Sequence, residues 1–259
     1  MLGKIVAPVI SITVLLVAFL GIGYYWASSP SSQVYGKILT HGKTEEKLVA
    51  LTFDDGPNEP WTSEIAETLK RYDVKATFFV VGANVDASPE TVKALVDAGH
   101  LVENHSYRHR KRDAVLEIHY GEMSKAEASI AKAAGVCPAL FRAPNGFHTP
   151  WQLHEVDLHK MHTVGWNVQP SDWENPPPET IVKRVLDSVK PGSIVLLHDG
   201  SDTNQGVDRQ ATLDALPGII EGLQAEGYRF VLLDELLSIK SDKPIEAYLS
   251  DCPQAGATP

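Results

Sequence analysis

The sequence is poor in cysteine and in positive charge for its length of 259 residues. Its two cysteines, Cys137 and Cys252, are far apart, and their spacing matches no zinc-binding motif. They could form a disulfide in an oxidising compartment, although spacing alone does not show that they meet. The net charge is −10 and no basic stripe is interleaved with aromatic residues, which argues against nucleic acid as a partner.

Charge is also missing from residues 5–26, a run of Ile, Val and Leu that ends in Tyr24, Tyr25 and Trp26. Such a run is long enough to span a bilayer, and its aromatic end resembles an interfacial belt. Because Lys4 precedes it, the positive-inside rule predicts a cytoplasmic amino terminus. We expect a single-pass membrane anchor over residues 1–27 with the remainder outside the cytoplasm. A cleaved signal peptide and a secreted protein are the alternative.

The rest of the chain shows no internal repeat, and 43% of the whole sequence is apolar, which is sufficient for a folded core. Residues 28–46 begin with a Ser- and Pro-rich stretch and are expected to form a linker. Over residues 47–240, strand-like and helix-like segments alternate, which predicts parallel strands joined by helices. The expected fold is α/β, a distorted and incomplete (β/α)7-type barrel in a single catalytic domain. Residues 241–259 are expected to be a tail.

Two separate segments combine into a candidate metal site. Asp54 and Asp55 follow a strand-like run, and such adjacent carboxylates repel each other unless a cation lies near them. His105 and His109 are four positions apart, the spacing of one helical turn, so both imidazoles can face one point. One Asp and two His leave positions open on a catalytic metal, and the other Asp is then free to accept a proton. The alternative is a helix cap and two surface histidines.

Other polar residues also follow predicted strands, where active sites of parallel sheets lie. His198 ends an apolar strand and suits a proton donor, although a lone histidine there is usually a core residue. Arg142 is expected to orient a carboxylate, and the turn after it to face an oxyanion, unless Arg142 is a surface ion-pair partner. Asp172 is expected to tune a neighbouring His or Arg, and Trp173 to line the pocket or the core.

Together these motifs resemble the polysaccharide deacetylases that share the NodB homology domain, also called carbohydrate esterase family 4. The resemblance covers residues 47–239, and the Thr-Phe-Asp-Asp-Gly and His-Ser-x-x-His motifs match in full. It implies that Asp54 is the general base and His198 the general acid. It further implies that Asp55, His105 and His109 bind a divalent metal, commonly zinc.

Two positions depart from the family pattern. Asn145 takes a place that is usually aromatic, but the family uses that residue through its main-chain N–H, which faces the oxyanion. Gln169 replaces an acidic residue three positions before Asp172, while Asp172 and Trp173 themselves match. We assign Pro144 and Trp173 to substrate contact.

The resemblance implies an enzyme that removes N-acetyl groups from polysaccharide containing N-acetylglucosamine, such as peptidoglycan or a chitin-like oligosaccharide, and releases acetate. Within the family, an esterase that removes O-acetyl groups from xylan is the alternative. Outside enzymes, the alternative is a glycan-binding module without catalysis. The sequence leaves the polymer and the oligomeric state open.

Overall fold

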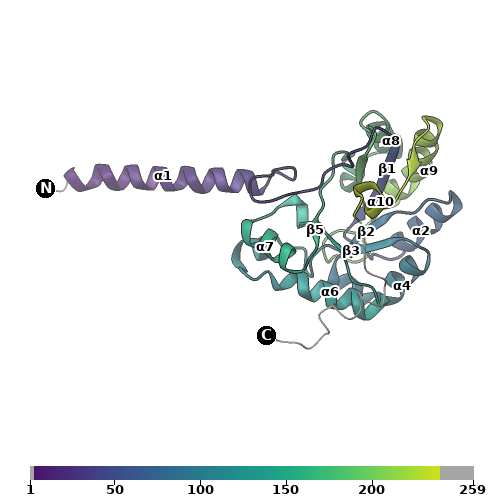
Figure 1. Cartoon of the computed structure of the whole chain (residues 1–259), viewed down its shortest axis with the longest axis horizontal. Helices are drawn as coiled ribbons and strands as arrows, with labels where there is room; N and C mark the ends of the chain where they lie inside the picture. Colours follow the sequence, from purple (N-terminus) through teal and green to yellow (C-terminus); the bar gives the residue numbers. More distant parts are fainter. Residues whose placement is uncertain (1–2, 240–259) are drawn as a thin grey trace.

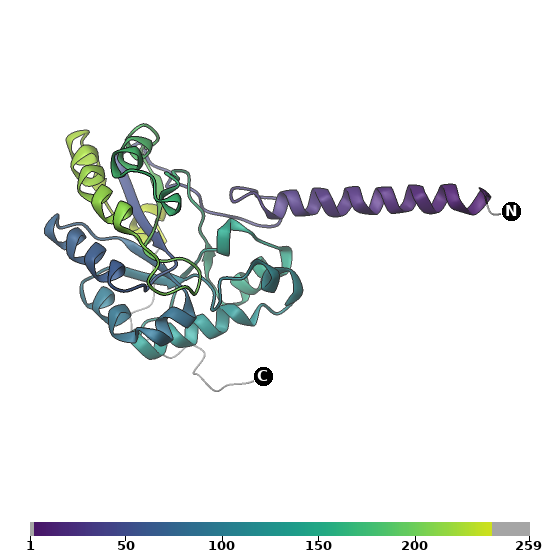
Figure 2. The same ribbon diagram turned by 180° about the vertical axis from the view of Figure 1, so that it is seen from behind.

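A computed structural model describes residues 3–239 of the chain, and side chains from residue 12 onward. A long helix, α1 (Gly3–Ala27), extends away from an α/β domain that contains all the other elements (Figures 1 and 2). The end of α1 contacts this domain: the Tyr24 and Phe147 rings lie 5.8 Å apart, and the Ala27 carbonyl accepts the His148 N–H.

The domain is built on a sheet of seven strands whose strand pairs are all parallel. Six strands follow the order β5-β4-β3-β2-β1-β6, and the seventh, β7, pairs with β1. The strands are β1 (Leu48–Asp54), β2 (Thr77–Val80), β3 (Leu101–Asn104), β4 (Leu140–Phe141), β5 (His162–Thr163), β6 (Ser193–His198) and β7 (Arg229–Phe230).

Helices connect these strands, as the parallel pairing requires. The α-helices after α1 are α2 (Trp61–Arg71), α3 (Gly82–Ala87), α4 (Pro89–Asp97), α5 (Lys111–Leu116), α6 (Gly121–Ala134), α7 (Pro150–Leu158), α8 (Pro178–Leu186), α9 (Gln210–Ala225) and α10 (Leu233–Leu237). Two short 3-10 helices, η1 (Pro144–Gly146) and η2 (Asp172–Glu174), follow β4 and β5. The predicted α/β class and alternation are confirmed.

The sheet is an incomplete barrel with an irregular seam between β5 and β6. Val49 of β1 pairs with both β6 and β7, so these two strands lie on opposite sides of β1. At the seam, isolated bridges replace a regular ladder: Leu39 with Val164, His41 with Ser193, and Val168 with Val195. Two of these bridges use residues 39 and 41, so this part of the segment expected to be a linker packs against the sheet.

The core explains why β1 and β6 read as nearly continuous apolar runs. Residues Val49 to Leu51 are fully buried, as expected for a parallel strand covered on both faces. The Phe53 and Phe78 rings stack at 5.1 Å between neighbouring strands. This packed core holds the carboxyl ends of the strands in register. The polar residues that follow the strands are therefore aligned as well.

Three predictions concern the two ends of the chain. Residues 3–27 are helical, but within residues 3–239 no helix is long and apolar enough to cross a membrane. The predicted anchor over residues 1–27 is therefore not supported, and the side chains of residues 1–11 lie outside the described part. The predicted tail, residues 241–259, also lies outside it. Cys137 is disulfide-bonded, while Cys252 is outside the described residues.

Candidate active site

The candidate site lies where strands β1, β3, β4 and β6 end. Asp54 is the last residue of β1 and pairs with His198, the last residue of β6. His105 follows β3 directly, and Arg142 follows β4 directly. Because parallel strands end at one edge of the sheet, four segments far apart in the sequence deliver their polar side chains to one place.

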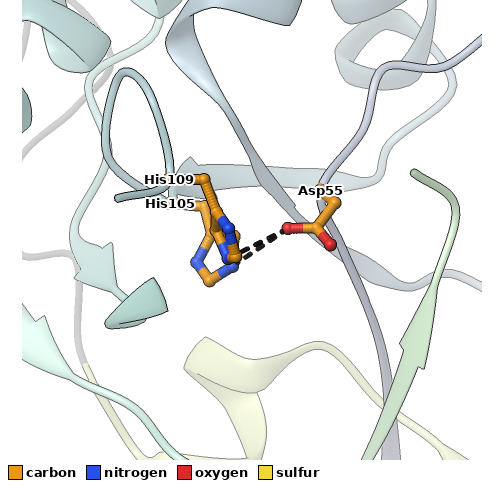
Figure 3. Close-up of side chains that lie close together, drawn as sticks. All are labelled: Asp55, His105 and His109. Atoms are coloured by element: carbon orange, nitrogen blue, oxygen red, sulfur yellow. Dashed lines mark ion pairs between the residues drawn. The ribbon is translucent and has the colours of Figure 1, made fainter. Parts of the chain in front are cut away.

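Asp55, His105 and His109 form a cluster whose ligand atoms all lie within 4.8 Å of one another (Figure 3). Asp55 Oδ1 is 3.4 Å from His105 Nε2 and 3.2 Å from His109 Nε2, and none of the three side chains is more than 9% exposed. Asp55 Oδ1 is buried without a hydrogen-bond partner among residues 12–239. One carboxylate and two imidazole nitrogens are a donor set that Zn²⁺ accepts, so the cluster fits a metal ion.

The two histidines converge for a reason other than the one their spacing indicates. Residues 105–110 form an irregular loop, not a helical turn. Ser106 and His109 both have left-handed backbones, with φ of 66° and 54°. The Ser106 hydroxyl accepts the His109 N–H at 3.0 Å and closes the loop. The predicted helical turn is therefore wrong, although the predicted convergence of the imidazoles is confirmed.

The ionisation of Asp55 follows from these neighbours. Burial alone would raise the pKa of its carboxyl, but His109 and His105 hold that pKa well below its usual range. Asp55 also has a left-handed backbone with φ of 78°, and the Asn84 amide donates to its carbonyl at 2.8 Å. The carboxylate is thus held charged and in a fixed position.

Asp54 is held by Arg142. Arg142 Nη1 donates to Asp54 Oδ1 at 2.6 Å and to Thr52 Oγ1 at 2.8 Å, and Nη2 donates to the Gly165 carbonyl at 3.1 Å. The guanidinium is fully buried and lies 4.1 Å from the centre of the Phe79 ring. Arg142 is therefore not a surface ion-pair partner. Arg142 occupies Asp54 Oδ1, while Asp54 Oδ2 lies 3.6 Å from His105 Nε2.

His198 is paired with Asp172, as the sequence predicts for a neighbouring His or Arg. His198 Nδ1 lies 2.9 Å from Asp172 Oδ1, and Asp172 Oδ2 accepts the His198 backbone N–H at 2.7 Å. Burial lowers the pKa of His198, but the Asp172 charge outweighs burial and raises it to about 9. Trp173 is 37% exposed and its ring lies 5.3 Å from that of His198, so it is not a core residue.

These groups open into a cavity of about 400 Å³. Asn145 lines it with a left-handed backbone, φ 55°, whereas Pro144 is buried and is not among the lining residues. The cavity also contains residues for which we predict no role. They are Lys111, Trp166, Leu196, Ser201, Asp202 and Arg209. Gln169, noted above as a departure from the family pattern, lines the cavity too.

The sequence could have indicated some of these unpredicted residues, because they closely follow a strand. Ser201 and Asp202 follow β6 closely, in the loop that begins directly after His198. Trp166 follows β5 in the same way, and its ring N–H donates to Gln169 at 2.7 Å. Lys111 and Arg209 carry no such signal, because they lie at helix starts whose approach to the cavity depends on the tertiary fold.

A second cluster, Asp113, Glu117 and Glu122, also brings its carboxylate oxygens within 4.8 Å of one another. Here Arg108 supplies the positive charge. Its Nη2 lies 2.6 Å from Glu122, 3.7 Å from Asp113 and 3.8 Å from Glu117. The guanidinium therefore occupies the position that a metal ion would take.

Comparisons with known proteins agree with this geometry. Residues 41–164 match the family model described as polysaccharide deacetylase. A peptidoglycan-N-acetylglucosamine deacetylase of Bacillus cereus is 37% identical over 201 residues, which cover 75% of this chain and 90% of that protein. A chitooligosaccharide deacetylase of a Bradyrhizobium species is 35% identical, with 73% and 90% covered.

Solved structures give the same result. The crystal structure of the Bc1960 peptidoglycan N-acetylglucosamine deacetylase, in complex with an N-hydroxybenzamide compound, superimposes with a TM-score of 0.73 at 34% identity. The match covers 78% of this chain and 92% of that one. The two proteins are therefore similar in both fold and sequence. The chain therefore belongs to the polysaccharide deacetylases with a NodB homology domain, carbohydrate esterase family 4.

Proposed function

We propose that this protein is a metal-dependent hydrolase that removes N-acetyl groups from N-acetylglucosamine units of a polysaccharide and releases acetate. The observation that carries the proposal is the division of labour between two adjacent carboxylates. Asp55 faces two imidazoles, while Asp54 gives Oδ1 to Arg142 and has Oδ2 3.6 Å from His105 Nε2, beside the ligand set. A ligand set with a spare base beside it is what hydrolysis of an amide requires.

Asp55, His105 and His109 are the residues that would hold the ion. A divalent ion such as Zn²⁺ would lower the pKa of a water molecule and polarise the acetamide carbonyl. Asp54, oriented by Arg142, takes the proton from the attacking water through Oδ2. Arg142 lies 2.6 Å from Asp54 Oδ1, and both side chains are buried, so the carboxylate is held in a fixed orientation.

The remaining residues act on the tetrahedral intermediate and the leaving group. The Asn145 main-chain N–H donates to the oxyanion, a role that does not depend on the side chain at this position. His198, protonated because Asp172 raises its pKa, gives its proton to the departing sugar amine. Trp173 offers a ring face to the sugar at the cavity edge.

The substrate we propose is a glycan that contains N-acetylglucosamine, with peptidoglycan first and a chitin-like oligosaccharide second. The names of the relatives above support this order. The open cavity, lined by Trp166 and Trp173, suits a sugar ring better than a small amide. An O-acetyl esterase would need the same base but less help for its leaving group, so the His198–Asp172 pair favours the amide.

We propose a location outside the cytoplasm. The disulfide at Cys137 supports it, because disulfides persist in oxidising compartments. The uncharged segment 5–26 is consistent with export. Membrane fractionation with an antibody to the domain distinguishes an attached protein from a released one, and recovery only in the cytoplasm would contradict the proposal.

The decisive assay measures acetate released from chitin oligomers, peptidoglycan and acetylated xylan, with and without a chelator. We expect release from an N-acetylated substrate that stops with chelator and returns with Zn²⁺. Release from xylan alone would favour the esterase. Tight glycan binding with no release from any substrate would favour the binding module.

A further inference from the structure

The two imidazoles of the candidate metal cluster differ in the group that contacts Nδ1, the ring nitrogen that does not face Asp55. His105 and His109 both turn Nε2 toward Asp55. In metal sites the other ring nitrogen of a ligand histidine normally donates to a carbonyl or carboxylate, which fixes the tautomer and the ring orientation. His105 meets this rule through the Arg142 carbonyl, which lies 2.8 Å from Nδ1.

His109 has a carboxylate in the corresponding position. Asp202 Oδ1 is in direct contact with His109 Nδ1. This nitrogen is buried, and it has no other hydrogen-bond partner among residues 12–239. Asp202 comes from the loop after β6, whereas His109 comes from the loop after β3. The contact therefore joins two loops that are remote in the sequence.

The backbone of Asp202 is fixed to the same site. A single amide group, Asn84 Nδ2, donates to the carbonyl of Asp202 and to the carbonyl of Asp55, both at 2.8 Å. Asn84 is buried at 2% exposure on helix α3. The neighbouring Gly200 packs so closely on Asp55 that a Cβ there would lie 2.3 Å from the Asp55 carbonyl oxygen. The loop is thus clamped to the residue that carries the ligand carboxylate.

We propose that Asp202 is a positioning residue of the metal site, the carboxylate that accepts the His109 Nδ1 proton and leaves Nε2 free to bind the ion. The proposal rests on the metal site of the proposed function and deepens it. Asp202 lines the cavity and its side chain is 55% exposed, so contact with substrate is the competing role. The two roles affect different quantities: positioning affects zinc affinity in the absence of substrate, and substrate contact affects KM alone.

The test is zinc affinity of the purified protein, measured by competition with a chromogenic chelator and without any substrate. We expect Asp202→Ala to weaken zinc binding about 10- to 100-fold, the usual effect of losing such a partner. Asp202→Asn keeps an acceptor oxygen without the charge, so its affinity should lie between those of the Ala variant and the parent. Asp214→Asn, which removes an exposed carboxylate on helix α9, should leave zinc affinity unchanged.

A second readout separates positioning from a general loss of structure. At saturating zinc, the Asp202→Asn protein should recover most of its turnover, because the ligands themselves are intact. Unchanged zinc affinity in both Asp202 variants would overturn the proposal, and a raised KM in the same variants would identify Asp202 as a substrate contact. Since the binding measurement uses zinc alone, it stands even if acetate release fails on every glycan tested.

Discussion

The protein contains two clusters of potential metal ligands, and they differ in what lies at their centre. In both, the ligand atoms fall within 4.8 Å of one another. The cluster of Asp113, Glu117 and Glu122 surrounds Arg108, so its charge is already compensated. In the cluster of Asp55 with His105 and His109, the ion-pair partners of Asp55 among the described residues are the two imidazoles, and no guanidinium is paired with it.

The difference teaches that proximity of acidic groups does not by itself indicate a metal site. A buried charge requires compensation from a side chain, a hydrogen-bond donor or an ion. Where a guanidinium faces the carboxylates, their charge is compensated and the cluster is structural. Where a carboxylate faces two imidazoles and no guanidinium, we expect an ion to complete the balance.

The largest effect is expected at the cluster of Asp55, His105 and His109. His105→Ala removes one of the three proposed ligands, so zinc retained after dialysis should fall to background, together with acetate release. Glu117→Gln removes a carboxylate from the cluster around Arg108, called the compensated cluster below, and should leave both zinc content and acetate release unchanged. Elemental analysis measures the zinc content of the two variants, and acetate release measures their activity. Equal zinc loss in the two variants would remove the distinction between the clusters.

The next effect concerns the carboxylate beside the ligands. Asp54→Asn should retain zinc but lower turnover about 10²- to 10⁴-fold, because the general base is lost while the ligands are untouched. The check is zinc stoichiometry and initial rate on one preparation. A rate close to that of the parent would show that another group accepts the proton.

A smaller effect is expected at His198, whose positive charge is compensated by Asp172. As a general acid His198 must be protonated, so activity should fall as pH rises through its pKa, which Asp172 raises to about 9. Asp172→Asn removes the neighbouring negative charge, and the basic limb of kcat/KM should move to lower pH by about 1 to 3 units. A limb that stays in place would mean that His198 does not supply the proton.

The smallest effect is expected on stability at the compensated cluster. Glu122 is buried at 1% exposure and accepts three hydrogen bonds from Arg108. Glu122→Gln should lower the free energy of unfolding by about 1.5–3 kcal/mol, since it weakens bonds to a charged group. Urea unfolding followed by circular dichroism measures the change, with Glu117→Gln as the partly exposed comparison. No loss of stability would remove the structural role assigned to this cluster.

Much of the site could be predicted from the sequence because it follows strand ends. Asp54 and His198 end short apolar runs that are typical of buried strands, and parallel strands bring such ends together. The His198–Asp172 and Arg142–Asp54 pairs follow from the same alignment. Strand positions were predictable because burial on both faces leaves a continuous apolar signal.

The parts that could not be predicted depend on loop geometry and tertiary approach. His109 reaches its place through left-handed residues in an irregular loop, which its spacing from His105 does not reveal. Asp202 lies beside His109 in a tertiary arrangement in which Asn84 joins the backbone of Asp202 to that of Asp55. The strand β5 ends at Thr163, and Val164 and Val168 form isolated bridges to other segments. Residues 39 and 41 join the same seam.

The central claim is that Asp55, His105 and His109 bind a divalent ion while Asp54 stays unligated. Anomalous diffraction at the zinc edge from a crystal of the zinc-loaded protein tests it directly. One strong peak is expected among those three side chains, with Asp54 bonded to Arg142 and outside the coordination sphere. A peak among Asp113, Glu117 and Glu122 instead, or Asp54 bound to the ion, would contradict it.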